Sequence, residues 1–214
     1  MDDTKTWQLI HDERAAMADT LDTLSSRDWS TRSLCGTWTV QMTAGHILAG
    51  AEQTKAHFMK RMAANGFRFN TTMDRDARRL AALAPSEIIT RLRARTTTTN
   101  GPPAPVVTML GEIVVHGQDI RGALGQTGDP NPEAVAACLQ MYSGANFPIG
   151  TKKRIAGLRL VAADVGWTHG AGLEVSGPGL SLLMAMTGRR AGIDGLTGGG
   201  LETLRDRMPQ SVAA

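Results

Sequence analysis

Apolar side chains recur every three or four residues along the first part of the chain, the spacing of an amphipathic helix. Residues 4–24 carry this pattern and predict a first helix. The polar stretch over residues 25–36 predicts a loop. A long second helix is expected to begin near Thr37 or Thr39 and to run to about Ala64, where an Asn-Gly pair stops it.

Proline and glycine divide the region that follows. Residues 66–84 are mixed and predict a turn and then a short helical piece rich in Arg and Ala. Pro85, with the serine and glutamate after it, is typical of a helix start, so a third helix should run from there and fade in the threonines at 96–99. Residues 100–103 are a clear break, and a fourth helix is expected over residues 105–124.

The pattern changes after residue 128. Residues 157–164 and 173–176 have the composition of strands, and the glycine-rich segment 168–172 between them predicts a hairpin-like turn. The other elements expected here are a helix near residues 133–142, a helix over residues 178–187 and a flexible loop over residues 195–200.

These elements predict an α+β protein made of two domains. Residues 1–128 form a four-helix bundle in this interpretation, and residues 129–214 form a small α+β domain. A chain of 214 residues is long enough to bury a hydrophobic core without disulfides to hold it together.

Composition and charge narrow the function classes. The chain has 23 basic and 20 acidic residues, and a net charge of +3 with scattered arginines does not predict nucleic-acid binding. No apolar run is long enough for a membrane span, and the first residues lack the pattern of a signal peptide. The two cysteines, Cys35 and Cys138, have no paired spacing, which favours a reducing, cytoplasmic location.

The strongest chemical signal lies in the predicted fourth helix. Glu112 and His116 are four residues apart, so they share a face of the helix, and apolar residues such as Ile113 and Ile120 lie on the same side. The pair should therefore point into the bundle core. An ionised carboxylate in such a core needs a hydrogen bond, an opposite charge or a metal.

A third ligand is available in the middle of the predicted second helix. His46 lies there among apolar residues, and Gly45 is expected to leave room around it. Helical bundles build metal sites from inward-facing residues of this kind. Two imidazoles and one carboxylate suit zinc and would also accept nickel, iron or manganese, with positions left open for water or substrate. The alternative is that His46 is an ordinary buried histidine and that no metal binds.

Four segments resemble one known family. Ser33–His46 (SLCGTWTVQMTAGH) and Gly111–Arg121 (GEIVVHGQDIR) are similar to motifs of the mycothiol-dependent maleylpyruvate isomerase family. Gly157–Trp167 (GLRLVAADVGW) and Met186–Arg189 (MTGR) resemble the small C-terminal domain of that family. The resemblance follows the order of the chain over nearly its whole length.

The resemblance implies a DinB-like metal-binding four-helix bundle, a sterol-carrier-like second domain and an active site at their junction. It implies that His46, Glu112 and His116 hold a divalent metal, with zinc the first choice. It also implies mycothiol, a sugar-cysteine thiol, as cosubstrate, and either isomerisation of a maleylpyruvate-like substrate or transfer of the thiol to another electrophile. Arg189, or Arg190 beside it, would face this site as a clamp for a substrate carboxylate, and the plain alternative is a solvated helix end.

Two residues near the motifs are weaker candidates. Asp119, three residues after His116, either orients that histidine as a metal ligand or is a plain surface aspartate. Cys35, near the start of the predicted second helix, either forms a reactive thiolate or is a half-buried loop cysteine, which is the simpler interpretation.

Three function classes stay open on these residues. The leading one is an enzyme that activates a small thiol and joins it to an electrophile, so that its partners are small molecules. A metal-dependent hydrolase would use the same open site to activate water. A non-enzymatic protein that binds a small ligand, with the metal in a structural role, is the third. The oligomeric state is not predicted from the sequence.

Overall fold

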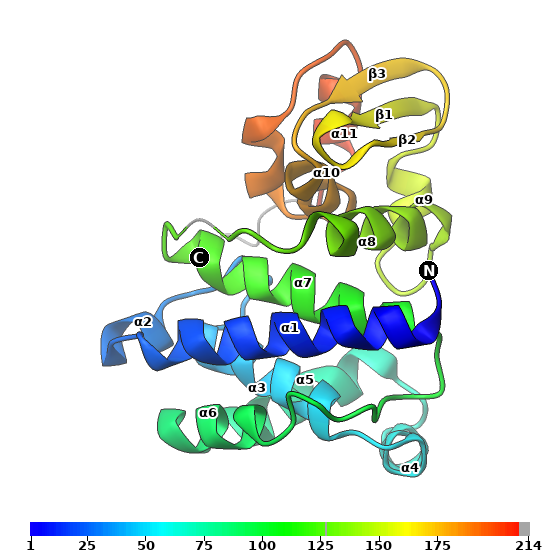
Figure 1. Cartoon of the computed structure of the whole chain (residues 1–214). Coiled ribbons are helices and arrows are strands. Elements are labelled where there is room, and N and C mark those ends of the chain that lie inside the picture. Colours follow the sequence, from blue (N-terminus) through cyan, green and yellow to red (C-terminus); the bar gives the residue numbers. More distant parts are fainter. Residues whose placement is uncertain (127, 210–214) are drawn as a thin grey trace. The chain divides into compact units, whose positions relative to one another are not determined.

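The computed structural model describes residues 1–126 and 128–209, and the chain divides into two compact units, Met1–Gly128 and Asp129–Ala214 (Figure 1). The first unit is built from helices. The second unit combines helices with a three-stranded sheet. The predicted α+β class is therefore confirmed.

Four helices form the bundle of the first unit, namely α1 (Asp3–Asp22), α3 (Val40–Glu52), α6 (Pro85–Arg93) and α7 (Val106–Ala123). Both α1 and α3 pack against α6 and against α7, so the four helices enclose one core. Burial of each large apolar side chain in such a core contributes about 1.5–3 kcal/mol. The largest side chains that are fully buried on these helices are Leu9, Ile10, Met17, Leu21, Leu48, Ile88, Leu92, Leu110 and Ile120.

The predicted single helix over residues 37–64 is wrong, because the chain leaves the helical path at Gln53. The backbone of this residue is extended (φ −76°, ψ 129°), and a separate helix, α4 (Lys55–Ala64), begins after it. The hydroxyl of Thr54 caps the new helix by accepting a hydrogen bond from the backbone N–H of His57 at 3.2 Å. Threonine stabilises a helix start better than a helix interior, which accounts for the break.

Two further segments of the first unit are more helical than predicted. The polar loop contains a short helix, α2 (Ser26–Ser30), capped by Ser25, whose hydroxyl accepts a hydrogen bond from the backbone N–H of Asp28 at 3.3 Å. The Asp28 carboxylate in turn accepts from the Ser25 backbone N–H at 2.9 Å. The piece expected within residues 66–84 is a full helix, α5 (Phe69–Ala81), which packs along α3.

The backbones of α3 and α5 approach each other closely at Gly45. A Cβ atom at this position would lie 2.9 Å from the carbonyl oxygen of Ala77 and 3.0 Å from the amide nitrogen of Ala81. Glycine permits this approach because it has no side chain. The expectation that Gly45 leaves room around His46 is therefore wrong, since α5 fills the space.

The sheet of the second unit has the order β2-β1-β3. β1 (Leu158–Ala162) pairs antiparallel with β2 (Trp167–His169) and parallel with β3 (Leu173–Ser176). The predicted hairpin that joins residues 157–164 to residues 173–176 is wrong, because the chain first forms β2 and then crosses to the other edge of β1, where β3 pairs parallel to it. Gly170 and Gly172 make this crossing with φ values of +77° and +121°, and their Cβ atoms would lie 2.3 and 2.1 Å from backbone oxygens at the start of β1.

Two helices of the second unit pack against this sheet. α10 (Gly179–Met186) packs against β1 and against α8 (Pro132–Gly144). The predicted flexible loop over residues 195–200 instead runs beside β3, where the backbones of Thr197 and Ser176 exchange hydrogen bonds of 2.9 and 2.8 Å. The shorter elements of this unit are α9 (Thr151–Arg154), η1 (Ala163–Val165), η2 (Arg190–Gly195) and α11 (Leu201–Asp206).

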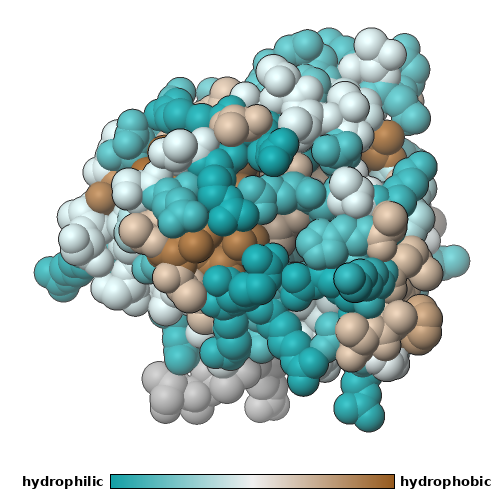
Figure 2. Space-filling view, turned by 90° about the horizontal axis from the view of Figure 1, so that it is seen from below, coloured by the Kyte–Doolittle hydropathy of each residue, from teal (hydrophilic) through white to brown (hydrophobic). Residues whose placement is uncertain are grey.

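The face shown in Figure 2 mixes hydrophilic and intermediate side chains with smaller apolar areas. Exposed apolar residues such as Met59 and Phe67 are ordinary for a folded domain. Within the described residues, no helix has both the length and the apolar character that crossing a membrane requires.

Candidate metal centre

Two packed helices of the bundle bring three potential metal ligands together. His46 lies on α3, whose first turn is fixed by Thr39, because the Thr39 hydroxyl accepts a hydrogen bond from the backbone N–H of Met42 at 3.2 Å. Glu112 and His116 lie one turn apart on α7, which packs against α3. The four-residue spacing on α7 and the helix packing together make the three side chains meet.

The ligand atoms of this triad converge on a small volume. Nε2 of His46 lies 2.6 Å from Oε2 of Glu112, and Nε2 of His116 lies 3.6 Å from the same oxygen. The two imidazole rings meet edge to face with their centroids 4.7 Å apart. One ligand atom from each of the three residues can be chosen so that all lie within 4.8 Å of one another.

The triad is closed on the side of the histidines and open on the side of the carboxylate. The side chains of His46 and His116 are only 10% and 12% exposed, whereas that of Glu112 is 42% exposed. Two nitrogen donors and one oxygen donor fit a divalent ion such as zinc. The accessible side leaves space for a further ligand from solution, as a catalytic site requires.

Asp119 is completely buried rather than a surface residue. Its Oδ2 lies 2.9 Å from Nδ1 of His116, one turn earlier on α7. A histidine that binds a metal through one ring nitrogen usually donates a hydrogen bond from the other to a carboxylate or carbonyl. The His116–Asp119 pair has this arrangement, with Nε2 left to face Glu112.

The two histidines differ in how they are held. Burial lowers the pKa of the His116 imidazole below its ordinary value, and the hydrogen bond to Asp119 opposes this shift only in part. The ring is therefore neutral at neutral pH, which is the form that binds metals. Nδ1 of His46 is also buried, but no hydrogen-bond partner contacts it among the described residues.

Trp38 forms a wall of the site beside the two histidines. Its ring centroid lies 5.1 Å from that of His46 and 6.2 Å from that of His116. The indole N–H donates a 3.0 Å hydrogen bond to Asp74 on α5, which ties the ring in place. The contact with α5 depends on the close approach of α3 and α5, so no local sequence signal predicts it.

The other predicted residues lie in different surroundings. Cys35 is half-buried in the loop before α3, and its ligand atom lies within 4.8 Å of those of His116 and Asp119. Arg189 belongs to the second unit, where it is half-buried and donates a 3.0 Å hydrogen bond from Nη1 to the carbonyl of Thr187. Arg190, the first residue of η2, is exposed.

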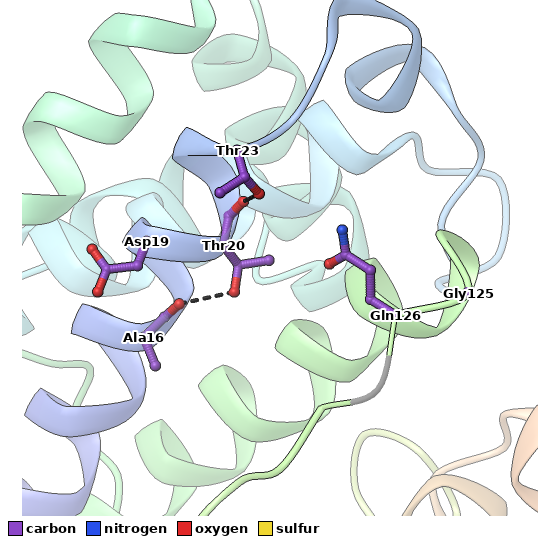
Figure 3. Close-up of a pocket in the computed structure, with 6 residues that line it drawn as sticks. All are labelled: Ala16, Asp19, Thr20, Thr23, Gly125 and Gln126. Atoms are coloured by element: carbon purple, nitrogen blue, oxygen red, sulfur yellow. Dashed lines mark hydrogen bonds between the residues drawn. The ribbon is translucent and has the colours of Figure 1, made fainter.

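A separate hollow lies beside the C-terminal part of α1 (Figure 3). It is shallow and open, and none of the triad residues lines it. The hydroxyl of Thr20 donates to the carbonyl of Ala16 at 2.9 Å, which satisfies the group within its own helix. The lining residues are Ala16, Asp19, Thr20, Thr23, Gly125 and Gln126.

Comparisons with known proteins agree with the resemblance seen in the sequence. Residues 10–101 match the family model of the mycothiol maleylpyruvate isomerase N-terminal domain. A search of curated proteins found no match. A crystal structure of the mycothiol-dependent maleylpyruvate isomerase is 17% identical, with a TM-score of 0.66 and 93% of each chain covered. The crystal structure of a histidine-to-alanine mutant is 15% identical, with a TM-score of 0.65 and the same coverage. The predicted resemblance is therefore confirmed, and these structures show the same fold.

Proposed function

We propose that this chain, which carries the N-terminal domain of the mycothiol maleylpyruvate isomerase family over residues 10–101, is a metal-dependent enzyme that activates a small thiol. The proposal rests on the convergence of His46, Glu112 and His116, with the carboxylate side accessible to solvent. Mycothiol is the proposed thiol. The proposed second substrate is an electrophile, either a maleylpyruvate-like compound that is isomerised or another acceptor that keeps the thiol.

The donor set supports zinc as the first choice of metal. His46 and His116 would hold the ion through ring nitrogens, and Glu112 would hold it through its carboxylate. When bound, zinc would supply a Lewis acid that brings the pKa of a thiol well below its free value of about 8.5, so that thiolate persists at neutral pH.

The chain's own residues prepare the site for this chemistry. Burial keeps the His116 ring neutral, and Asp119 fixes its orientation through the 2.9 Å contact with Nδ1. The negative charge of Glu112 offsets part of the charge of a divalent ion. Trp38 covers the histidine rings on one side, which excludes water there and leaves the Glu112 side for the substrates.

The proposed reaction is the addition of the thiol sulfur to an electrophilic carbon. In an isomerisation, a carbon–sulfur bond forms, the former double bond rotates as a single bond, and the thiolate leaves again as the double bond reforms. In a transfer, the carbon–sulfur bond persists and the adduct takes up a proton and leaves as product. Both reactions begin from the same activated thiol. They would therefore use the same metal triad and differ only in the acceptor substrate.

The experiment compares metal content and turnover in matched variants. Protein purified without chelator or nickel resin is analysed for bound metal and assayed with mycothiol and a maleylpyruvate-like substrate. We expect the wild type to hold metal and to turn over only when thiol is added. His116→Ala should lose both properties, and His57→Ala should keep both, because His57 is exposed on α4.

Two results would contradict the proposal in different ways. Full turnover by protein stripped of metal would show that the reaction does not need a metal held by the triad. Turnover that requires metal but has the same rate with and without added thiol would favour the hydrolytic alternative, in which the same ligands activate water.

A further inference from the structure

His116 belongs to a second cluster of potential ligands besides the triad. Cys35, His116 and Asp119 each offer one ligand atom, and these three atoms lie within 4.8 Å of one another. The two ring nitrogens of His116 face different groups. Nε2 lies 3.6 Å from Glu112, whereas Nδ1 lies 2.9 Å from Asp119. The two clusters therefore share one imidazole without having to share a ring nitrogen.

The loop that carries Cys35 is fixed against α7 by backbone hydrogen bonds. The amide of Leu34 donates to the carbonyl of Asp119 at 3.0 Å, which ties the loop to the residue that supplies the carboxylate. The amide of Cys35 donates to Oγ of Ser33 at 3.2 Å, and its carbonyl accepts from the amide of Trp38 at 3.0 Å. The backbone of Cys35 is thus held beside Asp119 by these hydrogen bonds.

The donor set of this cluster differs chemically from that of the triad. A thiol, a carboxylate and an imidazole include one soft donor, which selects ions that prefer sulfur, whereas the triad offers only nitrogen and oxygen. Asp119 is completely buried, whereas Cys35 is half-buried.

We propose that Cys35, Asp119 and His116 form a second cation site that takes a thiophilic divalent ion such as Cd²⁺ or Zn²⁺. Binding would form bonds from the ion to Sγ of Cys35 and to Nδ1 of His116, and would release both the thiol proton and the Nδ1 proton to solvent, so that the imidazolate of His116 joins the two sites. The ion would also replace the contact between Nδ1 of His116 and Asp119, which orients the triad. We expect thiol turnover to slow when this site is filled. That expectation rests on the proposed function, whereas the site itself does not.

The test is a titration of the purified protein, with its resident metal, by Cd²⁺ under anaerobic conditions. Ultraviolet absorbance from thiolate-to-metal charge transfer reports a bond to sulfur, and equilibrium dialysis reports the number of ions bound. The two cysteines provide matched variants, because Cys138 is fully buried on α8 in the second unit. We expect the wild type and Cys138→Ser to develop the absorbance and to bind one further ion per chain.

The variants separate this site from the triad. Cys35→Ser should lose the absorbance and the further ion but keep the resident metal. His46→Ala should lose the resident metal but keep the absorbance, so failure of the triad and failure of this site give different results. Absence of the band in the wild type, or its persistence in Cys35→Ser, would overturn the proposal.

A second measurement avoids reliance on a variant that fails to fold. Wild-type protein is treated with iodoacetamide with and without Cd²⁺, and alkylation of each cysteine is followed by mass spectrometry. We expect Cd²⁺ to protect Cys35 from alkylation. Equal labelling of Cys35 in the presence and absence of Cd²⁺ would show that the thiol binds no ion.

Discussion

Oδ2 of Asp119 lies 2.9 Å from Nδ1 of His116, and the Asp119 side chain has no exposure to solvent. A buried carboxylate is costly unless it is hydrogen-bonded or paired, so this contact is what the aspartate is placed to make. It also decides which nitrogen of His116 carries the proton, because a proton on Nδ1 leaves the lone pair on Nε2. The Nε2 atom is the one that faces Glu112.

The first prediction concerns this carboxylate. Asp119→Asn keeps the size of the side chain but removes its charge, so His116 becomes a weaker and less well oriented donor. We expect metal affinity to fall about 10- to 100-fold, measured by competition with a chelator. Asp12→Asn, on the exposed side of α1, should bind metal as the wild type does. Unchanged metal affinity in Asp119→Asn would show that Asp119 does not contribute to metal binding by the triad.

The second prediction concerns pH and the protein stripped of metal. Because burial lowers the pKa of His116, the unfolded chain binds more protons than the folded chain just below the ordinary histidine pKa of about 6.5. The free energy of unfolding should therefore rise with pH through this window and fall as the pH drops below about 6.5. Urea denaturation at a series of pH values measures this slope.

Two histidine variants identify the source of the slope. His116→Gln should flatten the dependence of stability on pH below about 6.5, because it removes the buried group that resists protonation. His57→Gln should leave the slope as it is in the wild type, since His57 is exposed. An equal slope in His116→Gln and the wild type would mean that another group causes the dependence.

The third prediction concerns the two neighbouring arginines of the second unit. Arg189 is half-buried and its guanidinium donates to the carbonyl of Thr187, whereas Arg190 is exposed. If Arg189 binds a substrate carboxylate, Arg189→Lys loses the planar, two-pronged contact. We expect KM for a carboxylate substrate to rise in Arg189→Lys and to stay unchanged in Arg190→Lys. The reverse pattern would assign the contact to Arg190.

The bundle and the triad could be predicted because their signals are local and periodic. Glu112 and His116 share a helix face by their spacing alone, and His46 lies in the middle of a helix with an apolar side. The long-range contacts that hold the surroundings of the triad could not be predicted in this way. Trp38 is held by Asp74, and Cys35 reaches Asp119 through a loop anchored by a long-range backbone hydrogen bond.

The incorrect predictions of a hairpin in the second unit and of a single long helix at α3 also have physical causes. The glycines at 170 and 172 suit a tight hairpin turn, but they equally suit a chain that crosses close to another backbone, as it does here. The sequence pattern predicts that Thr54 lies within a long helix. Its hydroxyl instead caps a new helix, because the backbone of Gln53 is extended. In both cases one residue type serves two conformations, and contacts distant in the sequence decide between them.

The last prediction uses two glycines of the same helix. Gly45→Ala places a Cβ atom 2.9 Å from the carbonyl oxygen of Ala77, and because the obstacle is backbone, α3 and α5 must move apart. Overpacking of this kind costs about 1–3 kcal/mol. At Gly50 the nearest atom to a new Cβ is the end of the flexible Met109 side chain at 3.5 Å, an ordinary contact. Gly50→Ala should be neutral or stabilise by up to about 1 kcal/mol, through helix propensity.

Urea denaturation of the metal-free variants distinguishes the two effects, because both substitutions add the same methyl group to α3. A lower midpoint for Gly45→Ala, with the midpoint of Gly50→Ala equal to or above that of the wild type, would show that the α3–α5 backbone contact limits the first position. Since Asp74 on α5 also holds Trp38 against the histidines, Gly45→Ala should shift the tryptophan fluorescence as well. Equal stability of the two variants would mean that α5 yields freely, and that its position does not constrain the wall of the metal centre.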